Sequence, residues 1–214
     1  MEPLIERDLE KMSAGPTVHD TLCPFLEAAI HLILYSRRVY PQEIFERRRH
    51  LDVSVFRSRH RDLNEHIALV VRGTRQLLER GEADALVVSI LGTRGEILER
   101  FRFELRVDHQ PVDVAALQAH LRGFLLKLHM CEAMLAPLPA DAELSFTTEL
   151  HTLDARSAQP LPGPLREEWV EADVARELRA TSGGSEPSLV PLKSLSLDGI
   201  TLDLSVLAAR EPPT

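Results

Sequence analysis

The sequence LCPFLEAAIHLILY, residues 22–35, is apolar almost all the way round a helical turn. A helix with so little polar surface is enclosed by protein, so we expect it to be the central helix of a globular core. Its longest uncharged run, residues 28–36, is far shorter than the about 20 residues that span a bilayer. Pro24 is tolerated in a first turn but costly further inside, so the sequence predicts a helix that begins near residues 21–23, or is kinked there, and runs to Arg38.

Composition favours one acidic, globular domain. The 214 residues are 44% hydrophobic and carry a net charge of −8, with a pI of about 5.6. A broad basic surface for binding nucleic acid is therefore not indicated, although basic clusters occur at residues 47–50 and 57–61. Cys23 and Cys131 lie within apolar helical patterns, and the polar segment 1–14 does not resemble a signal peptide. Both cysteines are expected to be buried thiols rather than disulfide partners or metal ligands.

Hydrophobic periodicity predicts an α+β protein. The elements expected after the central helix are a strand at 51–56, a helix at 62–80, hairpin strands at 85–91 and 98–107, a helix at 114–136, and strands at 143–150, 189–192 and 200–206. In the second hairpin strand, Leu98, Phe101 and Phe103 alternate with arginines such as Arg100 and Arg102. One face of the sheet is therefore expected to be buried and the other charged, with the helices on a single side.

The chain changes character after Thr152. Residues 159–164 are rich in proline, the only tryptophan, Trp169, lies in an acidic stretch, and residues 182–187 form a glycine- and serine-containing link. The two strand-like segments of the tail are thus carried on loose connections.

No catalytic constellation is found. The chain lacks a phosphate-binding glycine loop, an HExxH motif and a nucleophile elbow. His129 and Cys131 would point about 200° apart on a helix, so they cannot share a metal ion. Glu149 and His151 could form an acid–base pair, but they alternate along a strand with ordinary polar neighbours. We expect no enzymatic activity and no cofactor or metal; a small α/β enzyme stays open only if a pocket holds a strongly perturbed acid or base.

Several motifs fall in an order and spacing typical of one known family. They are LEAAIHLILY at 26–35, VYP at 39–41, IF at 44–45, DLN at 62–64, LRGFLLK at 121–127, Trp169 and LVPLK at 189–193. Over about residues 18–208 the chain closely resembles the HORMA-domain family, and within it the branch of accessory subunits of DNA polymerase zeta.

The resemblance implies a HORMA fold, in which three helices pack on one face of an antiparallel sheet and a mobile C-terminal "safety belt" wraps a partner peptide. It divides the chain into a flexible leader at 1–16, a HORMA domain at 17–209 and a tail at 210–214. Within the domain, the core would be residues 17–151 and the belt residues 152–209.

The function implied is that of a non-catalytic adaptor in translesion synthesis and double-strand-break repair. Its partners would be a peptide of the polymerase zeta catalytic subunit, the C-terminal domain of the translesion scaffold polymerase, shieldin subunits and an AAA+ ATPase that remodels HORMA proteins. A homodimer or HORMA heterodimer is expected in the nucleus, and also in the cytoplasm, without direct binding of nucleic acid or membrane. A spindle-checkpoint or meiotic-axis adaptor is the alternative.

The resemblance also assigns residues to the peptide groove. Trp169 matches the tryptophan that packs on the threaded peptide; alternatively it only anchors its own loop. His66 replaces the family's tyrosine in the groove, and it can stack but lacks the phenol hydroxyl.

Two further surfaces are implied. Arg122 matches an arginine of the self-association surface, with a solvated helix arginine as the alternative. For docking of the scaffold polymerase, Leu189 agrees with the family pattern, whereas Asp203 and Ser205 stand where a glutamine and a tyrosine are usual.

Overall fold

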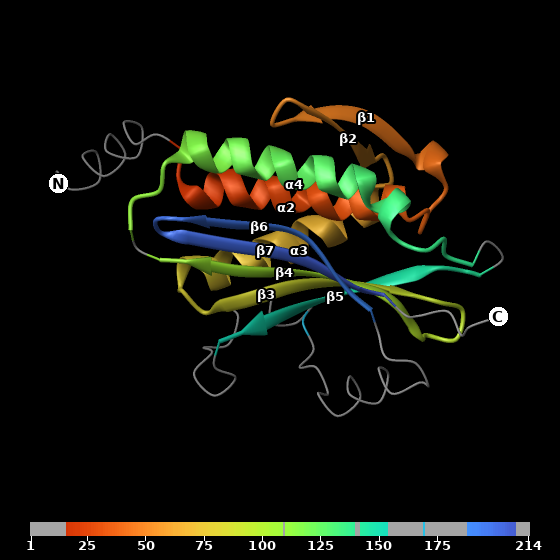
Figure 1. Cartoon of the computed structure of the whole chain (residues 1–214). Coiled ribbons are helices and arrows are strands. Elements are labelled where there is room, and N and C mark those ends of the chain that lie inside the picture. Colours follow the sequence, from red (N-terminus) through yellow and green to blue (C-terminus); the bar gives the residue numbers. More distant parts are fainter. Residues whose placement is uncertain (1–15, 109, 140–141, 154–168, 170–187, 209–214) are drawn as a thin grey trace, which may run out of the picture.

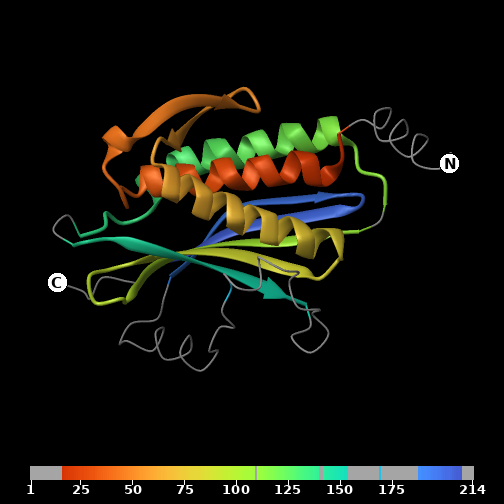
Figure 2. The same cartoon turned by 180° about the vertical axis from the view of Figure 1, so that it is seen from behind.

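The computed structural model describes residues 16–108, 110–139, 142–153, 169 and 188–208. The expected leader at 1–16, apart from Pro16, the expected tail at 210–214 and most of the expected belt lie outside this part of the chain. Three helices cover one face of a five-stranded antiparallel sheet, and a two-stranded ribbon lies on the far side of the helices (Figures 1 and 2). The predicted α+β arrangement is confirmed.

The elements follow the expected order, with two additions, η1 and β1. They are α2 (Val18–Ser36), the short 3-10 helix η1 (Gln42–Ile44), β1 (Phe45–His50), β2 (Val53–Ser58), α3 (Arg61–Glu79), β3 (Ala83–Leu91), β4 (Ile97–Val107), α4 (Val114–Met134), β5 (Ser145–Thr152), β6 (Ser188–Leu197) and β7 (Ile200–Ala208). None of the described helices is both long and apolar enough to cross a membrane.

The central helix α2 begins earlier than predicted. Thr17 and Asp20 form a capping box: the Thr17 hydroxyl accepts from the Asp20 N–H at 3.2 Å, and the Asp20 carboxylate accepts from the Thr17 N–H at 3.1 Å. This cap satisfies two otherwise orphaned N–H groups and starts the helix at Val18. The predicted start near residues 21–23 was therefore wrong, and Pro24 lies inside the helix.

One core packs between α2, the other helices and the sheet. The Phe25 ring of α2 lies edge-on to Phe103 of β4 and Phe124 of α4, with centroids 6.5 Å and 5.9 Å away. The C-terminal strands β6 and β7 supply the buried side chains Leu192, Leu195, Ile200, Leu202, Leu204 and Val206. The hydrophobic core thus includes side chains from residues 188–208, the last part of the expected belt region.

On β4 the buried face carries one acid. The predicted pattern placed Leu98 on the apolar face, but Glu99 lies there and is only 2% exposed. Arg37 donates to the two Glu99 carboxylate oxygens at 2.9 Å and 2.6 Å, and also to the Ala136 carbonyl at 2.6 Å. Burial raises the pKa of Glu99, while Arg37 opposes that rise. The ion pair joins the end of α2 to β4, and it lets a carboxylate occupy a core position.

Sequence periodicity missed β1. Its sequence FERRRH has no apolar alternation, yet it pairs with β2 from Phe45↔Ser58 to His50↔Val53. The turn consists of Leu51 and Asp52, both with positive φ, of 47° and 61°. The strand predicted at 51–56 is β2, which begins two residues later than predicted, at Val53, and pairs with β1 in the two-stranded ribbon.

Candidate functional site

The sheet has two outer strands that differ in position and surroundings. Its order is β5-β3-β4-β7-β6, so β5 and β6 form the edges. β5 ends with Thr152 beside Ala83, the first residue of β3, whereas β6 begins with Ser188 beside Ala208, which pairs with Glu99. The connection between them therefore joins diagonally opposite corners of the sheet, a distance of about 30 Å from strand spacing and rise.

No described strand pairs with the outer side of β5. Its sequence, SFTTELHT, contains three threonines and one phenylalanine, and neither lysine nor proline. Most of its residues are half-buried. Such an edge presents backbone N–H and C=O groups that can pair with another strand.

His66 lies at one end of this edge. Its ring is edge-on to Phe146 of β5, with centroids 5.6 Å apart, and Tyr40 approaches Phe146 from another element at 6.2 Å. Burial raises the pKa of Tyr40. His66 thus contacts β5 itself, and its predicted contact with a partner peptide stays a prediction.

Trp169 lies near the other end of β5. A Cβ placed on Gly73 of α3 would be 3.1 Å from the Leu150 Cδ1 atom and 3.4 Å from the Trp169 indole nitrogen. Helix, strand and indole therefore meet closely, and the absence of a side chain at Gly73 makes this possible. The indole N–H is buried and has no hydrogen-bond partner among the described residues.

These two predicted residues lie beside the same strand, at different points along it. Phe146 and Leu150 are four positions apart on the helix-facing side of β5, which corresponds to about 13 Å. His66 and Trp169 therefore flank a strand-length segment of the same open edge. Their sequence separation of about a hundred residues gave no local signal for this arrangement.

Leu189, Asp203 and Ser205 lie elsewhere, around the opposite edge. Strand register places Asp203 beside Glu104 and Ser205 beside Arg102, on the face of the sheet turned away from the helices. Leu189 is 61% exposed. The structure thus gathers these three residues on the β6–β7 hairpin and separates them from Trp169.

Arg122 forms a third location, on α4. Its Nε donates to the Leu51 carbonyl at 3.0 Å, and its Nη2 lies 3.1 Å from an Asp52 carboxylate oxygen. Arg122 therefore links α4 to the turn of the β1–β2 ribbon, while its side chain stays 46% exposed, so both its place at a self-association surface and the solvated alternative stay predictions. Beyond it, spaced at four residues along α4, lie the exposed apolar side chains Leu126, Met130 and Met134. That spacing was the sequence signal for an exposed stripe.

The acid–base pair considered from the sequence belongs to an ion-pair network. His151 Nε2 lies 3.3 Å from a Glu149 oxygen, and His151 Nδ1 lies 3.4 Å from Arg102. Arg102 in turn pairs with Asp84 at 3.1 Å. This network covers the face of the sheet opposite the helices, and strand pairing accounts for its geometry.

The groups with the largest pKa shifts are core residues. Burial lowers the pKa of His31 to about 4, with a smaller contribution from Arg57, and its Nδ1 accepts from the Ser58 N–H at 3.4 Å. Burial raises the pKa of Cys23 and Cys131 to about 11, and both are free thiols, as predicted. No cluster of three or more potential metal ligands occurs within the described residues.

Comparisons with known proteins agree with this architecture. The family model described as "HORMA domain" matches residues 21–147. The chain is 34% identical to the mitotic spindle assembly checkpoint protein MAD2B of Bos taurus over 96% of both chains, and 30% identical to the DNA polymerase zeta processivity subunit of Arabidopsis thaliana over 86% of this chain and 82% of that protein. It is 26% identical to the spindle checkpoint component MAD2 of Saccharomyces cerevisiae over 72% of this chain and 79% of that protein.

Solved structures share the fold. A chain of the mitotic checkpoint complex superposes with a TM-score of 0.74 at 20% identity, covering 90% of this chain and 98% of that one. C. elegans HTP-2 bound to a HIM-3 closure motif gives a TM-score of 0.66 at 12% identity, covering 89% of each chain. The protein described here is a member of the HORMA domain family.

Proposed function

We propose that this protein is a non-catalytic adaptor that captures a segment of a partner protein as an added strand on the outer edge of β5. The observation that carries the proposal is the open edge of β5, flanked by His66 and Trp169. A strand added there would hydrogen-bond through its main chain, while alternate side chains would meet the two aromatic rings and confer specificity.

The buried indole N–H supports this assignment. A donor without a partner in a buried position costs about 1 to 3 kcal/mol. A carbonyl of an added strand could accept from the Trp169 Nε1 and remove that cost. Residues 152–187 then act as the belt that closes over the bound segment, since they must cross from β5 to β6 at the opposite corner of the sheet.

The relatives suggest the partners. We infer that the captured segment comes from the catalytic subunit of DNA polymerase zeta, because the chain is 30% identical to a polymerase zeta processivity subunit. Docking of the translesion scaffold polymerase is assigned to Leu189, Asp203 and Ser205. Shieldin subunits and an AAA+ remodelling ATPase are further proposed partners, with action in the nucleus and also in the cytoplasm.

The test uses overlapping 20-residue peptides from the polymerase zeta catalytic subunit of the same organism, immobilised for binding kinetics. The full chain should bind one segment tightly and release it slowly. A second protein, in which residues 155–186 are replaced by a glycine–serine linker of equal length, keeps β6 and β7 but lacks Trp169. It should release the peptide at least a hundredfold faster, since a belt acts mainly on dissociation. Equal release rates for the two folded proteins would refute capture under a belt.

A second function, self-association through α4, is favoured by the exposed stripe of Leu126, Met130 and Met134 beside Arg122. Arg122→Ala should weaken dimers while leaving peptide release unchanged, because α4 lies away from β5. Sedimentation of the parent and the variant at matched concentrations measures this. An unchanged monomer–dimer balance in a parent that dimerises would remove Arg122 from the interface.

A further inference from the structure

A basic depression lies next to the proposed peptide edge. It is formed between the end of β2 and the outer face of α3, has a volume of about 790 Å³, and is lined by Arg57, Arg59, Arg61 and Arg72, with His66 also among its lining residues. None of the activities considered above makes use of it.

The local charge opposes that of the whole chain. Residues 37–75 contain ten arginines and five carboxylates, a net charge of +5 in a protein whose total is −8, so the remaining residues carry −13. A cationic surface of this kind in an acidic protein attracts anionic groups locally, within a screening length of about 8 Å at physiological salt.

The arginines that line the depression are only partly neutralised by ion pairs. Arg57 pairs with Glu27 at 3.1 Å, and Arg61 pairs with Glu65 at 2.7 Å, both at exposed positions where such pairs contribute little. Arg59 donates to the Glu43 carbonyl, which is not a charged partner. Among the described residues, Arg72 has no ion-pair partner. The depression thus retains more positive than negative charge.

The depression is continuous with the β5 edge through one side chain. His66 lines the depression and also contacts Phe146, the second residue of β5. A strand paired with β5 that extends beyond Phe146 would therefore pass His66 and reach the arginine-lined depression, at about 3.3 Å per residue.

We propose that the arginine-lined depression binds an acidic flank of the captured peptide, and so selects partners that carry aspartate or glutamate on one side of the strand-forming segment. This inference rests on the proposed capture at β5 and specifies its partner class. The bound flank gains charge-assisted hydrogen bonds, for which the planar guanidinium groups are well suited.

An acidic peptide fits this surface better than nucleic acid does. A nucleic acid presents a continuous row of phosphates and requires an extended basic track. Here Glu65 lies inside the depression, and the remainder of the chain carries −13. A peptide flank with two or three carboxylates can be bound by the four arginines that line the depression.

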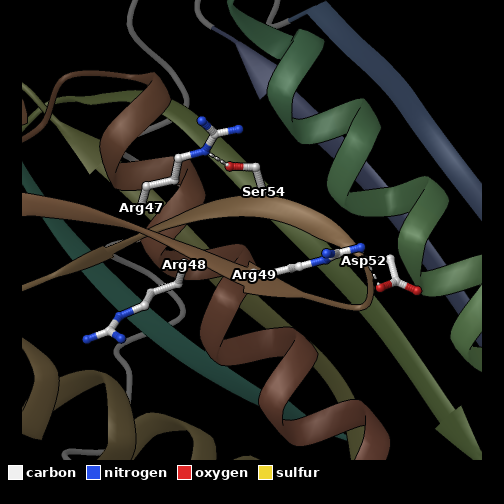
Figure 3. A pocket seen from close by; sticks show the side chains of 5 residues that line it. All are labelled: Arg47, Arg48, Arg49, Asp52 and Ser54. Atoms are coloured by element: carbon white, nitrogen blue, oxygen red, sulfur yellow. Dashed lines mark hydrogen bonds and ion pairs between the residues drawn. The ribbon is translucent and has the colours of Figure 1, made fainter.

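The experiment is selection from a library of displayed random 16-residue peptides on three proteins: the full chain, Arg61→Gln/Arg72→Gln, and the control Arg47→Gln/Arg48→Gln. The control removes the same charge from the β1–β2 ribbon, where Arg47 contacts Ser54, Arg48 pairs with Glu46, and the two side chains point apart (Figure 3). Peptides enriched on the full chain and on the control should carry acids on one flank only, and that bias should vanish on Arg61→Gln/Arg72→Gln.

The strongest enriched peptide is then compared with its copy in which flanking Asp and Glu are replaced by Asn and Gln. On the full chain the neutral copy should bind about tenfold more weakly at low salt, and the difference should shrink at high salt. On Arg61→Gln/Arg72→Gln the two copies should bind equally.

The outcomes separate the two proposals. Enriched peptides without acidic bias, or the same bias on all three proteins, would overturn the acidic-flank inference and leave capture at β5 standing. Failure of all three proteins to enrich any peptide would remove both. Single-stranded DNA that binds the full chain and loses that binding in Arg61→Gln/Arg72→Gln would assign the depression to nucleic acid and overturn the inference.

Discussion

The two edges of the sheet are built in opposite ways. β6 contains Pro191, which cannot donate a backbone hydrogen bond, and its register shifts between Pro191 and Lys193. Lys193 then packs along α4, with its ammonium 5.5 Å from the centre of the Phe124 ring. β5 has no proline, no lysine and no described strand on its outer side. Proline, bulges and lysine are common means of blocking edge pairing, so among the described strands the sheet is protected at β6 and has no partner at the outer side of β5.

The largest effect should come from removing the protected edge. A chain that stops after Leu153 loses the buried side chains of β6 and β7, and leaves the backbone edge of β4 without its partner strand. Each buried leucine or valine contributes about 1.5 to 3 kcal/mol, and the sum approaches the whole stability of a domain. We expect the truncated chain to lose its cooperative thermal transition, measured by circular dichroism and calorimetry.

The glycine–serine linker protein serves as the control for that truncation. It lacks residues 155–186 but retains both strands, so its transition should stay within a few degrees of the parent. A truncated chain that unfolds cooperatively near the parent temperature would show that β6 and β7 are an accessory to the fold.

A second prediction contrasts one side chain from each edge. Trp169→Ala should weaken peptide binding by about 2 to 4 kcal/mol, the range for a central aromatic anchor, mostly through faster release. Leu189→Ala removes an exposed side chain at the protected edge and should leave release unchanged. The measurement is the release rate from the immobilised peptide. If the two substitutions changed that rate equally, the claim that peptide binds at β5 and not at β6 would be wrong.

The smallest effects concern two helix glycines, one near each edge. Alanine in a helix interior is favoured over glycine by about 1 kcal/mol. At Gly123 a new Cβ would meet the Lys193 Cε at 2.8 Å, the flexible end of a side chain that can shift. At Gly73 it would meet Leu150 and the Trp169 ring, which have less freedom. We expect Gly123→Ala to be neutral or stabilising by a few tenths of a kcal/mol.

Gly73→Ala should gain no stability and should speed peptide release severalfold by displacing the indole. Urea unfolding and peptide kinetics on both variants measure these effects. If Gly123→Ala changed peptide release as much as Gly73→Ala, the indole would not be the cause.

The elements with strong periodicity were predictable. Residues 22–35 specify an enclosed helix through their own composition, and the alternation of Ile200, Leu202, Leu204 and Val206 specifies a strand with one buried face, which the structure has as β7. In these segments the local pattern and the tertiary environment agree, so the sequence alone sufficed.

The features that the sequence did not predict share a physical cause. Each depends on contacts with residues that are distant in the sequence. β1 was not recognised since its arginines are solvated and its pairing depends on β2. Glu99 broke the expected alternation because Arg37, 62 positions away, compensates its charge. The sequence shows the basic cluster at 57–61, but not that the approach of β2 to α3 adds Arg72 and His66 to form one depression.

The diagonal connection between β5 and β6 has a kinetic consequence. A bound segment enclosed between the β5 edge and residues 154–187 would pass through a closed loop. That loop would consist of the connecting chain and the hydrogen-bonded strands between β5 and β6. If folded domains flank that segment on both sides, it cannot slide out, and escape requires β6 and β7 to detach. Exposing their buried side chains costs on the order of 10 kcal/mol, or about seven powers of ten in population. Such a complex would dissociate on the timescale of local unfolding, so rapid partner exchange would require an energy-consuming machine.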